Sequence, residues 1–199
     1  MVIQYSQGQC PACLDQVSLG SKSTLCFTCC TVTCNTCAIY LHKKECPVCK
    51  APFNIPIIEQ IRNLSKVILF DIGDNKKGMA HAMLAQIYKL LRDNTARDIH
   101  LKKGAYYGNV WCFITIGKNY HENGDLKNAE RWYQVPLKMG SSAATWNIAL
   151  IYMKRGQYKE AKELFQKVND GESREKIAFI NNKLCKPNSI PPLIRSTLI

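Results

Sequence analysis

The sequence predicts two parts: a small, cysteine-rich α+β head and, after it, an all-α solenoid of helical repeats. Nine of the eleven cysteines lie in the first 49 residues, so only the head requires sulfur chemistry. Beyond residue 55, similar amphipathic segments recur at a constant offset of 32 residues. We therefore expect a head over residues 1–54, a connecting helix over 55–77, three helix–turn–helix repeats over 78–173, a capping helix over 174–186 and a flexible tail over 187–199.

The composition is that of a folded protein with a basic surface. Hydrophobic residues make up 46% and charged residues 21% of the 199 positions, which argues against a disordered chain. The net charge is +12, but many lysines fall on solvated helix faces, so nucleic-acid binding is disfavoured. The first ten residues lack a signal-peptide pattern, and the apolar run at 110–116 is too short to span a membrane. We expect a soluble cytoplasmic or nuclear protein that is not secreted.

Eight of the clustered cysteines form four CxxC pairs. A CxxC turn places two soft sulfur ligands at the angle that one tetrahedral zinc ion requires. Four pairs predict two zinc ions, each held by four sulfurs and therefore structural, because no coordination position stays open. A disulfide scaffold is the alternative, and a reducing compartment disfavours it. The pairs are Cys10 with Cys13, Cys26 with Cys29, Cys34 with Cys37, and Cys46 with Cys49.

The order of these pairs resembles the RING finger in its all-cysteine form. Successive ligands are separated by 2, 12, 2, 4, 2, 8 and 2 residues, and the segment CPVCKAPF at 46–53 is similar to the end of many RING domains. The resemblance covers residues 8–54. A PHD finger has a similar early layout, but it would place a histidine at Cys34 and a longer gap before Cys46.

The RING resemblance implies two interleaved zinc sites, one built from the first and third pairs and one from the second and fourth. Metal would then replace the core that so short a head cannot supply, without being needed to fold the helices. Cys29 and the adjacent Cys30 compete for one position; the two-residue spacing favours Cys29, and Cys30 remains the alternative. His42 is a further rival ligand, interpreted as a surface residue. Site one would be Cys10, Cys13, Cys34 and Cys37, and site two Cys26, Cys29, Cys46 and Cys49.

RING domains act as ubiquitin ligases without a nucleophile, because they hold a charged conjugating enzyme in a reactive pose. The resemblance therefore implies a ligase with no catalytic residue, with a conjugating enzyme and ubiquitin as partners. Ala12 is smaller than the aliphatic residue usual at its position, and Lys50 lacks the forked donors of arginine. The alternative is a non-catalytic zinc-binding adaptor or scaffold. The implied contacts with the conjugating enzyme are Ala12, Leu14, Tyr40, Leu41, Pro47 and Lys50.

The helical part contains two recurring motifs. The segments LAQIY, IGKNY and IALIY begin at residues 84, 116 and 148, and GDLKNAERWY at 124–133 matches GQYKEAKELF at 156–165. In the first copy, Arg92 and Arg97 replace the turn glycine and the packing alanine. The pattern predicts turns at Gly124 and Gly156, close helix contacts at Ala129 and Ala161, and buried aromatic rings at Tyr133 and Phe165.

These helix–turn–helix motifs resemble tetratricopeptide or Sel1-like repeats over residues 78–170. A preceding helix over 57–70 would pack on the first repeat near Leu84 and Tyr88. The side chains expected to make this contact are Ile57, Ile58, Ile61, Leu64 and Ile68.

Helical-repeat arrays commonly bind a protein or peptide in a groove lined by their inner helices. Tryptophan and cationic side chains in such a groove suit an acidic peptide or a chain terminus. Trp111 and Trp146 could instead be part of the core between repeats. The sequence contains no GxxxxGK[ST], GxSxG or HExxH motif, so no active site is expected in the helices. The predicted groove residues are Lys89, Trp111, Lys118, His121, Trp146, Met153 and Lys154.

Overall fold

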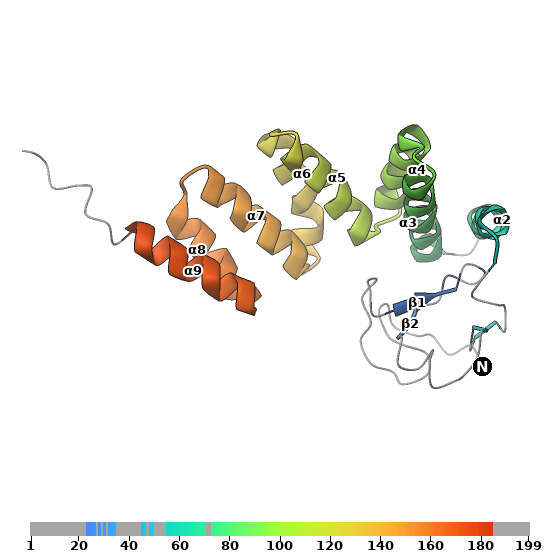
Figure 1. Cartoon of the computed structure of the whole chain (residues 1–199), viewed down its shortest axis with the longest axis horizontal. Coiled ribbons are helices and arrows are strands. Elements are labelled where there is room, and N and C mark those ends of the chain that lie inside the picture. The colour runs from blue at the N-terminus through green and yellow to red at the C-terminus, as the bar shows by residue number, and fades with distance from the viewer. Residues whose placement is uncertain are drawn as a thin grey trace, which may run out of the picture. The chain divides into compact units, whose positions relative to one another are not determined.

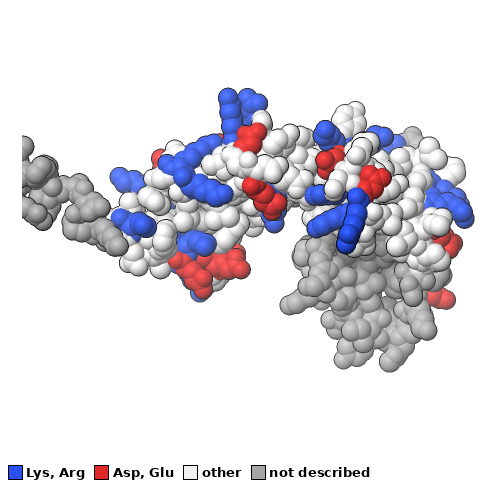
Figure 2. All heavy atoms as spheres, turned by 45° about the horizontal axis from the view of Figure 1, so that its top comes forward, with Lys and Arg blue, Asp and Glu red and all other residues white. Residues whose placement is uncertain are grey.

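The computed structural model describes residues 23–26, 28, 30, 32–34, 45, 46, 48, 49, 55–70 and 73–184. The chain divides into two compact units, the first ending at Cys112 and the second beginning at Phe113. Among the helices of the described part, none combines the length and the apolar character needed to cross a membrane. On the face shown in Figure 2, basic side chains over the helices are interspersed with acidic ones.

The head in the first unit contains a small antiparallel hairpin (Figure 1). Strand β1 (Ser23–Leu25) pairs with strand β2 (Val32–Cys34), and Thr24 lies opposite Thr33. Between the strands the chain folds back on itself, because the Cys30 amide donates to the Cys26 carbonyl over 3.0 Å. Cys30 has a φ of 57°, in the left-handed region, which turns the chain toward β2. The hairpin thereby brings Cys26 and Cys30 to one end of the short sheet.

Three helices complete the first unit: α2 (Ile57–Leu69), α3 (Asp74–Leu90) and α4 (Asn94–Tyr106). Helix α3 packs against both of the others, as Figure 1 shows. Leu64 and Val67 of α2 are buried with Met83 and Leu84 of α3, in a core that also contains Cys30. The head and the first helices therefore share one hydrophobic core.

The predicted packing of α2 is confirmed in part and is wrong at its start. Leu64 is fully buried, and Ile61 and Ile68 are partly buried against the cluster that contains Leu84 and Tyr88. Ile57 and Ile58, however, are 42% and 75% exposed. They lie in the first turn of α2, before the helix meets α3, and Val67 one turn beyond Leu64 takes the buried position instead.

The second unit is all-helical. Helix α5 (Val110–Glu122) begins just before the boundary between the units and is followed by α6 (Leu126–Lys138), α7 (Ser142–Lys154), α8 (Tyr158–Val168) and α9 (Gly171–Leu184). The predicted contact residues Ala129 and Ala161 are fully buried, as are the rings of Tyr133 and Phe165. Helix α9 packs on α8, and its Ile180 closes the core around Phe165.

The 32-residue offset appears in the hydrogen bonds of the turns as well as in the sequence. After α5 the Asp125 amide donates to the Tyr120 carbonyl, and after α7 the Gln157 amide donates to Tyr152, both over 2.9 Å. The preceding residues, Gly124 and Gly156, have φ values of 81° and 76°. This is the Schellman ending, in which a left-handed residue lets the amide after it satisfy a helix carbonyl. The helical hairpins α5–α6 and α7–α8 therefore follow one design.

Candidate functional site

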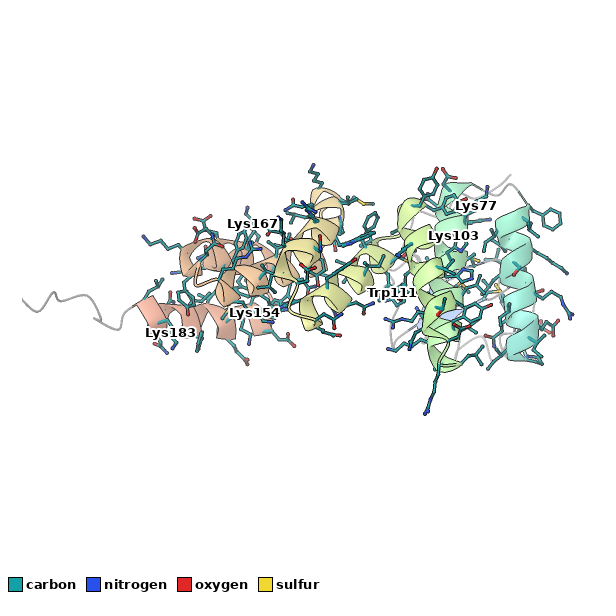
Figure 3. All side chains as sticks on the ribbon, turned by 90° about the horizontal axis from the view of Figure 1, so that it is seen from above. Lys77, Lys103, Trp111, Lys154, Lys167 and Lys183 are labelled. Carbon is teal, nitrogen blue, oxygen red and sulfur yellow. The ribbon has the colours of Figure 1, made fainter. Side chains whose placement is uncertain are left out.

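The second unit contains a groove of about 540 Å³ between α5 and α7. Its lining includes five of the seven predicted groove residues. Figure 3 labels Lys154 at the end of α7. The predicted residues that the structure brings together here are Lys118 and His121 of α5 and Trp146, Met153 and Lys154 of α7.

Trp146 is at the same time a wall of this groove and part of the core. Its ring meets the Phe165 ring edge to face, with centroids 4.9 Å apart and planes at 71°. The side chain remains only partly buried, together with Leu150 and Met153 of the same cluster. The two interpretations of this tryptophan are therefore compatible: one side of the ring supports α8, and the rest lines the groove.

The polar part of the groove is predominantly basic. Lys118 and Lys154 are exposed at its sides, and Glu122 is the one acidic residue among the described lining. Burial lowers the pKa of His121, as does the neighbouring Lys154, while Glu122 opposes the shift. Within the described residues, the Nε2 atom of His121 is buried without a hydrogen-bond partner. The exposed side chains of the groove therefore carry mainly positive charge, and the Nε2 atom of His121 lies beneath them.

Two predicted groove residues lie elsewhere. Lys89 is exposed in the last turn of α3, and Trp111 is partly buried in the first turn of α5; both belong to the first unit. Conversely, the structure adds Glu122, Asn147 and Leu150 to the lining. The Asn147 amide donates to the Ala143 carbonyl over 2.6 Å, which holds this polar side chain against its own helix. Its position beside Trp146 and four residues before Ile151 is a sequence signal that could have placed it on the inner face, although the amide itself resembles an ordinary polar residue.

The head of the first unit contains a second candidate site, made of three cysteines. The sulfur atoms of Cys26, Cys46 and Cys49 all lie within 4.8 Å of one another. The Cys26 and Cys49 sulfurs are 3.5 Å apart, too far for a disulfide bond. These residues come from the second and fourth CxxC pairs, the two pairs that were predicted to share a zinc ion.

The geometry of the three sulfurs fits a tetrahedral thiolate site. Zn–S bonds of about 2.3 Å imply sulfur–sulfur edges of about 3.8 Å, close to the observed separation. The Thr28 amide lies 3.4 Å from the Cys26 sulfur, and the Val48 amide lies 3.4 Å from the Cys46 sulfur. Both amides come from the residue two places after a cysteine, so the two turns present their sulfurs in the same way. Such N–H donors orient sulfur ligands and suit a negatively charged thiolate.

Cys30 does not belong to this group of sulfurs within the described part of the head. Its buried side chain instead packs into the cluster with Leu64 and Val67. Cys34 is the last residue of β2, where its backbone pairs with Ser23. The other predicted residues of the head lie outside the described residues: Cys10, Ala12, Cys13, Leu14, Cys29, Cys37, Tyr40, Leu41, His42, Pro47 and Lys50.

Comparison with known proteins agrees with the helical architecture. Residues 144–170 match the tetratricopeptide repeat family, and this match covers nearly all of α7 and the whole of α8. A search of curated proteins finds no match to the chain. Tetratricopeptide repeats generally bind other proteins. The chain therefore contains a tetratricopeptide repeat at 144–170 within an all-helical repeat architecture suited to protein–protein interaction.

Proposed function

We propose that the groove between α5 and α7 binds an extended, acidic segment of a partner protein. The observation that carries this proposal is the combination of Trp146 with Lys118 and Lys154 around one groove. Partly buried aromatic and aliphatic side chains supply an apolar anchor site, and the exposed lysines attract carboxylates.

A peptide-binding measurement on the full chain tests this proposal. A fluorescein-labelled peptide that alternates glutamate and leucine should bind, and the same peptide with glutamine for glutamate should bind roughly tenfold more weakly. Binding should weaken as salt is added, because exposed charges are screened. Equal binding of the two peptides would show that charge does not select the ligand.

Groove variants locate the binding surface. Lys118→Gln and Lys154→Gln should each weaken binding by about two- to fivefold, the range of a single exposed charge pair. Trp146→Phe keeps an aromatic ring against Phe165 and should weaken binding through loss of contact area. The matched control is Lys159→Gln, because Lys159 is exposed on α8 and does not line the groove. A loss of binding in the control equal to that in the groove variants would overturn the assignment.

We further propose that the head binds two structural zinc ions as a RING-type domain and that the chain is a ubiquitin ligase. The sulfur cluster supports the zinc site in this proposal, and the ligase activity rests on the RING resemblance alone. Cys26, Cys46 and Cys49 would hold one ion, with Cys29 as the fourth ligand. Zinc would supply a rigid cross-link and no reacting group, because four sulfurs leave no open position. In this proposal the head recruits a charged ubiquitin-conjugating enzyme, and the groove selects the substrate.

Two measurements test the finer proposal. Metal analysis should give about two zinc ions per chain, and Cys29→Ser but not Cys30→Ser should lose metal. Autoubiquitination across a panel of conjugating enzymes should show activity that increases in Ala12→Ile, which enlarges the implied contact. Zinc binding without activity in either protein would assign the chain to the alternative class, a zinc-stabilised adaptor that binds its partner through the same groove.

A further inference from the structure

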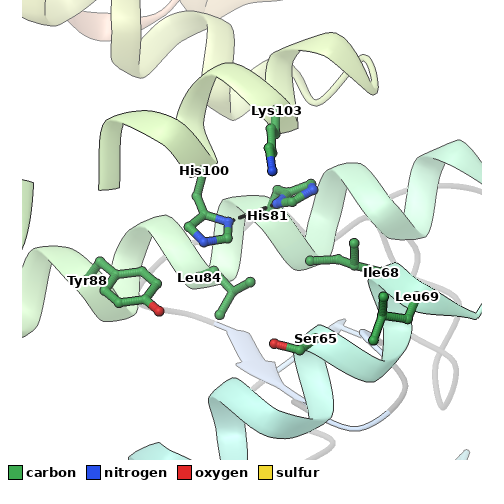
Figure 4. Close-up of a pocket in the computed structure, with 8 residues that line it drawn as sticks. All are labelled: Ser65, Ile68, Leu69, His81, Leu84, Tyr88, His100 and Lys103. Carbon is green, nitrogen blue, oxygen red and sulfur yellow. Dashed lines mark hydrogen bonds between the residues drawn. The ribbon is translucent and has the colours of Figure 1, made fainter. Parts of the chain in front are cut away.

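The first unit contains a pocket of about 240 Å³ between α2, α3 and α4 (Figure 4). Its nitrogen-containing side chains are His81 from α3 and His100 and Lys103 from α4. Opposite them, Leu84 of α3 and Ile68 and Leu69 of α2 give the pocket an apolar wall. None of these residues belongs to the sulfur cluster or to the groove between α5 and α7.

The two histidines form a rigid pair. Their Nδ1 atoms are 2.9 Å apart, so one ring donates a hydrogen to the other. The His81 ring stacks on Tyr107, with planes at 8°, and the His100 ring stacks on Tyr88, with planes at 12°. His81 is only 3% exposed. The neighbouring rings therefore hold both imidazoles in place.

The shared hydrogen constrains the outer nitrogens of the pair. In the neutral pair, the ring that donates from Nδ1 has a bare Nε2, and the ring that accepts at Nδ1 must carry its hydrogen on Nε2. One Nε2–H donor is therefore always present. When the pair takes up a proton, both Nε2 atoms become donors. Figure 4 shows the second ring nitrogen of His100 on the side that faces Leu84.

The charges around the pocket favour an anion. The amine of Lys103 lies beside His81 in Figure 4, and no described carboxylate pairs with this lysine. The described lining contains no acidic residue, and α2 contributes no charged group to it. The other groups near the two histidines are Tyr88 and Lys77 of α3 and Tyr107, which directly follows α4. The Lys77 amine lies 5.9 Å from the centre of the Tyr107 ring. A metal cation would meet only positive or neutral groups here.

The number of donors selects among anions. Ser65 lines the pocket, but its hydroxyl already donates to the Ile61 carbonyl over 2.8 Å. The donors that remain are the Lys103 amine, the imidazole pair and the Tyr88 hydroxyl. The Tyr88 hydroxyl lies at the end of the lining away from Lys103 in Figure 4, so the amine and the imidazole pair are the donors matched to the two oxygens of a carboxylate. A phosphate dianion would leave further oxygens facing Leu84 and Ile68 without partners, which is costly. The apolar wall instead suits a short hydrocarbon body.

We propose that this pocket binds a small aliphatic carboxylate, with its oxygens on Lys103 and the His81–His100 pair and its hydrocarbon against Leu84, Ile68 and Leu69. Binding would be linked to uptake of a proton by the pair. Burial is the main cause that lowers the pKa of both His81 and His100. The positive charge of Lys103 lowers both pKa values further, and His100 also lowers the pKa of His81. A bound anion offsets these positive neighbours, so the complex should hold a proton that the empty pocket does not.

Titration of the full chain with butyrate, followed by NMR of the histidine ring nitrogens, tests the proposal. Butyrate should shift the His81 and His100 signals, and its affinity should increase at least fivefold between pH 7.5 and pH 5.5. Butyramide, the neutral analogue, should produce no such shift. Acetyl-leucine carries the same carboxylate on a blocked residue; tighter binding than butyrate would assign the pocket to a protein chain end, and weaker binding to a free metabolite.

Variants complete the test. Lys103→Met should reduce butyrate affinity at least fivefold and leave the helical spectrum unchanged, because the lysine side chain is exposed. His100→Gln should remove the pH dependence of binding. Lys102→Gln is the matched control, because this exposed neighbour does not line the pocket, and it should bind as the unmodified chain does. Equal binding of butyrate and butyramide, or unchanged affinity in Lys103→Met, would overturn the proposal.

Discussion

Arg92 has a backbone conformation that residues with a Cβ atom normally avoid. Its φ is 59°, and the residues 32 and 64 positions later are Gly124 and Gly156, with φ values of 81° and 76°. The hydrogen bonds of the turn are also the same, because the Asp93 amide donates to the Tyr88 carbonyl over 3.0 Å. The turn geometry therefore determines φ, and the arginine in the first repeat adopts it at an energetic cost.

We expect Arg92→Gly to stabilise the protein by about 0.5–1 kcal/mol, since glycine removes the left-handed strain but adds chain entropy to the unfolded state. Urea unfolding monitored by circular dichroism measures the change. Lys89→Gly, three residues earlier and inside α3, should have the opposite sign. A loss of stability in Arg92→Gly would show that the arginine side chain makes a contact worth more than the strain.

His81 should make the stability of the first unit depend on pH. Burial, followed by the charges of His100 and Lys103, lowers the pKa of His81 to about 4 from 6.5. The unfolded chain therefore binds a proton at pH values where the folded chain does not, so the contribution is complete above pH 6.5 and is lost as pH falls toward 4. Unfolding in MES and then in N-methylpiperazine buffer, neither of which contains a carboxylate, should show a loss of roughly 2–3 kcal/mol over this window. His81→Gln should flatten the curve; an unchanged slope would assign the effect to other groups.

At the level of the helices, the hairpin α5–α6 depends on a close approach between Gly117 and Tyr133. A Cβ atom placed on Gly117 would overlap the Tyr133 ring, whose Cδ1 and Cζ atoms would each be 2.8 Å away. The ring is fully buried, and its hydroxyl has no hydrogen-bond partner in the described structure. Burial and the charge of Glu122 raise the pKa of Tyr133. The glycine therefore serves helix packing and not a turn.

Gly117→Ala should destabilise the protein by about 1–2 kcal/mol, because the methyl group overpacks a rigid aromatic contact by more than alanine gains in helix propensity. Gly171→Ala is the control, since nothing lies within 4 Å of a Cβ atom at this first position of α9. That change should be neutral or slightly stabilising. Thermal unfolding of both variants measures the change in the midpoint temperature. Equal changes in Gly117→Ala and Gly171→Ala would mean that α5 and α6 separate to admit the methyl group.

The sequence predicts these helices well where contacts repeat and less well where they do not. Ala129, Ala161, Tyr133 and Phe165 could be assigned to the core because the same offset places each pair at equivalent positions. The isoleucines at the start of α2 could not be assigned in this way, because periodicity defines a helix face but not where a neighbouring helix begins to cover it. The pairing of residues 81 and 100 was also missed, since it depends on how two helices align across a turn.

At the level of the whole chain, the sulfur cluster and the first helices share a core through Cys30. Its side chain is buried with Leu64 and Val67, and it directly follows the Cys26 turn. The sequence predicted that metal would matter only for residues 8–54. The position of Cys30 leads us to expect that loss of metal also loosens the packing of α2 on α3.

Hydrogen exchange with and without a zinc chelator tests this coupling. Peptides covering residues 57–90 should exchange at least tenfold faster after metal removal, because opening of the Cys26–Cys30 turn uncovers Leu64 and Val67. Peptides covering 142–184 should keep their protection, since α7, α8 and α9 contribute their own core. Cys49→Ser should reproduce the effect of the chelator, whereas Cys185→Ser, which lies in none of the CxxC pairs, should not. Unchanged protection at 57–90 would show that the helices hold without the head.

A candidate site could be predicted from the sequence where its residues belong to one motif or to equivalent helices, and not where unrelated helices bring them together. Five groove residues were found because they lie on the inner faces of two equivalent helices, whereas Asn147 was missed because a buried amide bonded to its own helix resembles an ordinary polar residue in sequence. The grouping of Cys26 with Cys46 and Cys49 followed from the order of the CxxC pairs. The pocket at His81 has no sequence motif, because its donors come from two helices and its apolar wall includes a third.

The regular spacing of the turns has a consequence for protein engineering. Gly108 and Gly140 have φ values of 77° and 78°, and each is followed by a residue, Asn109 or Ser141, whose side chain caps the next helix. The two junctions are interchangeable, so a second copy of residues 109–140 inserted after Gly140 would meet the same backbone geometry at both of its ends. Such a duplication would lengthen the chain by a whole hairpin without a new linker, and it offers a simple way to add a further binding surface by tandem copying.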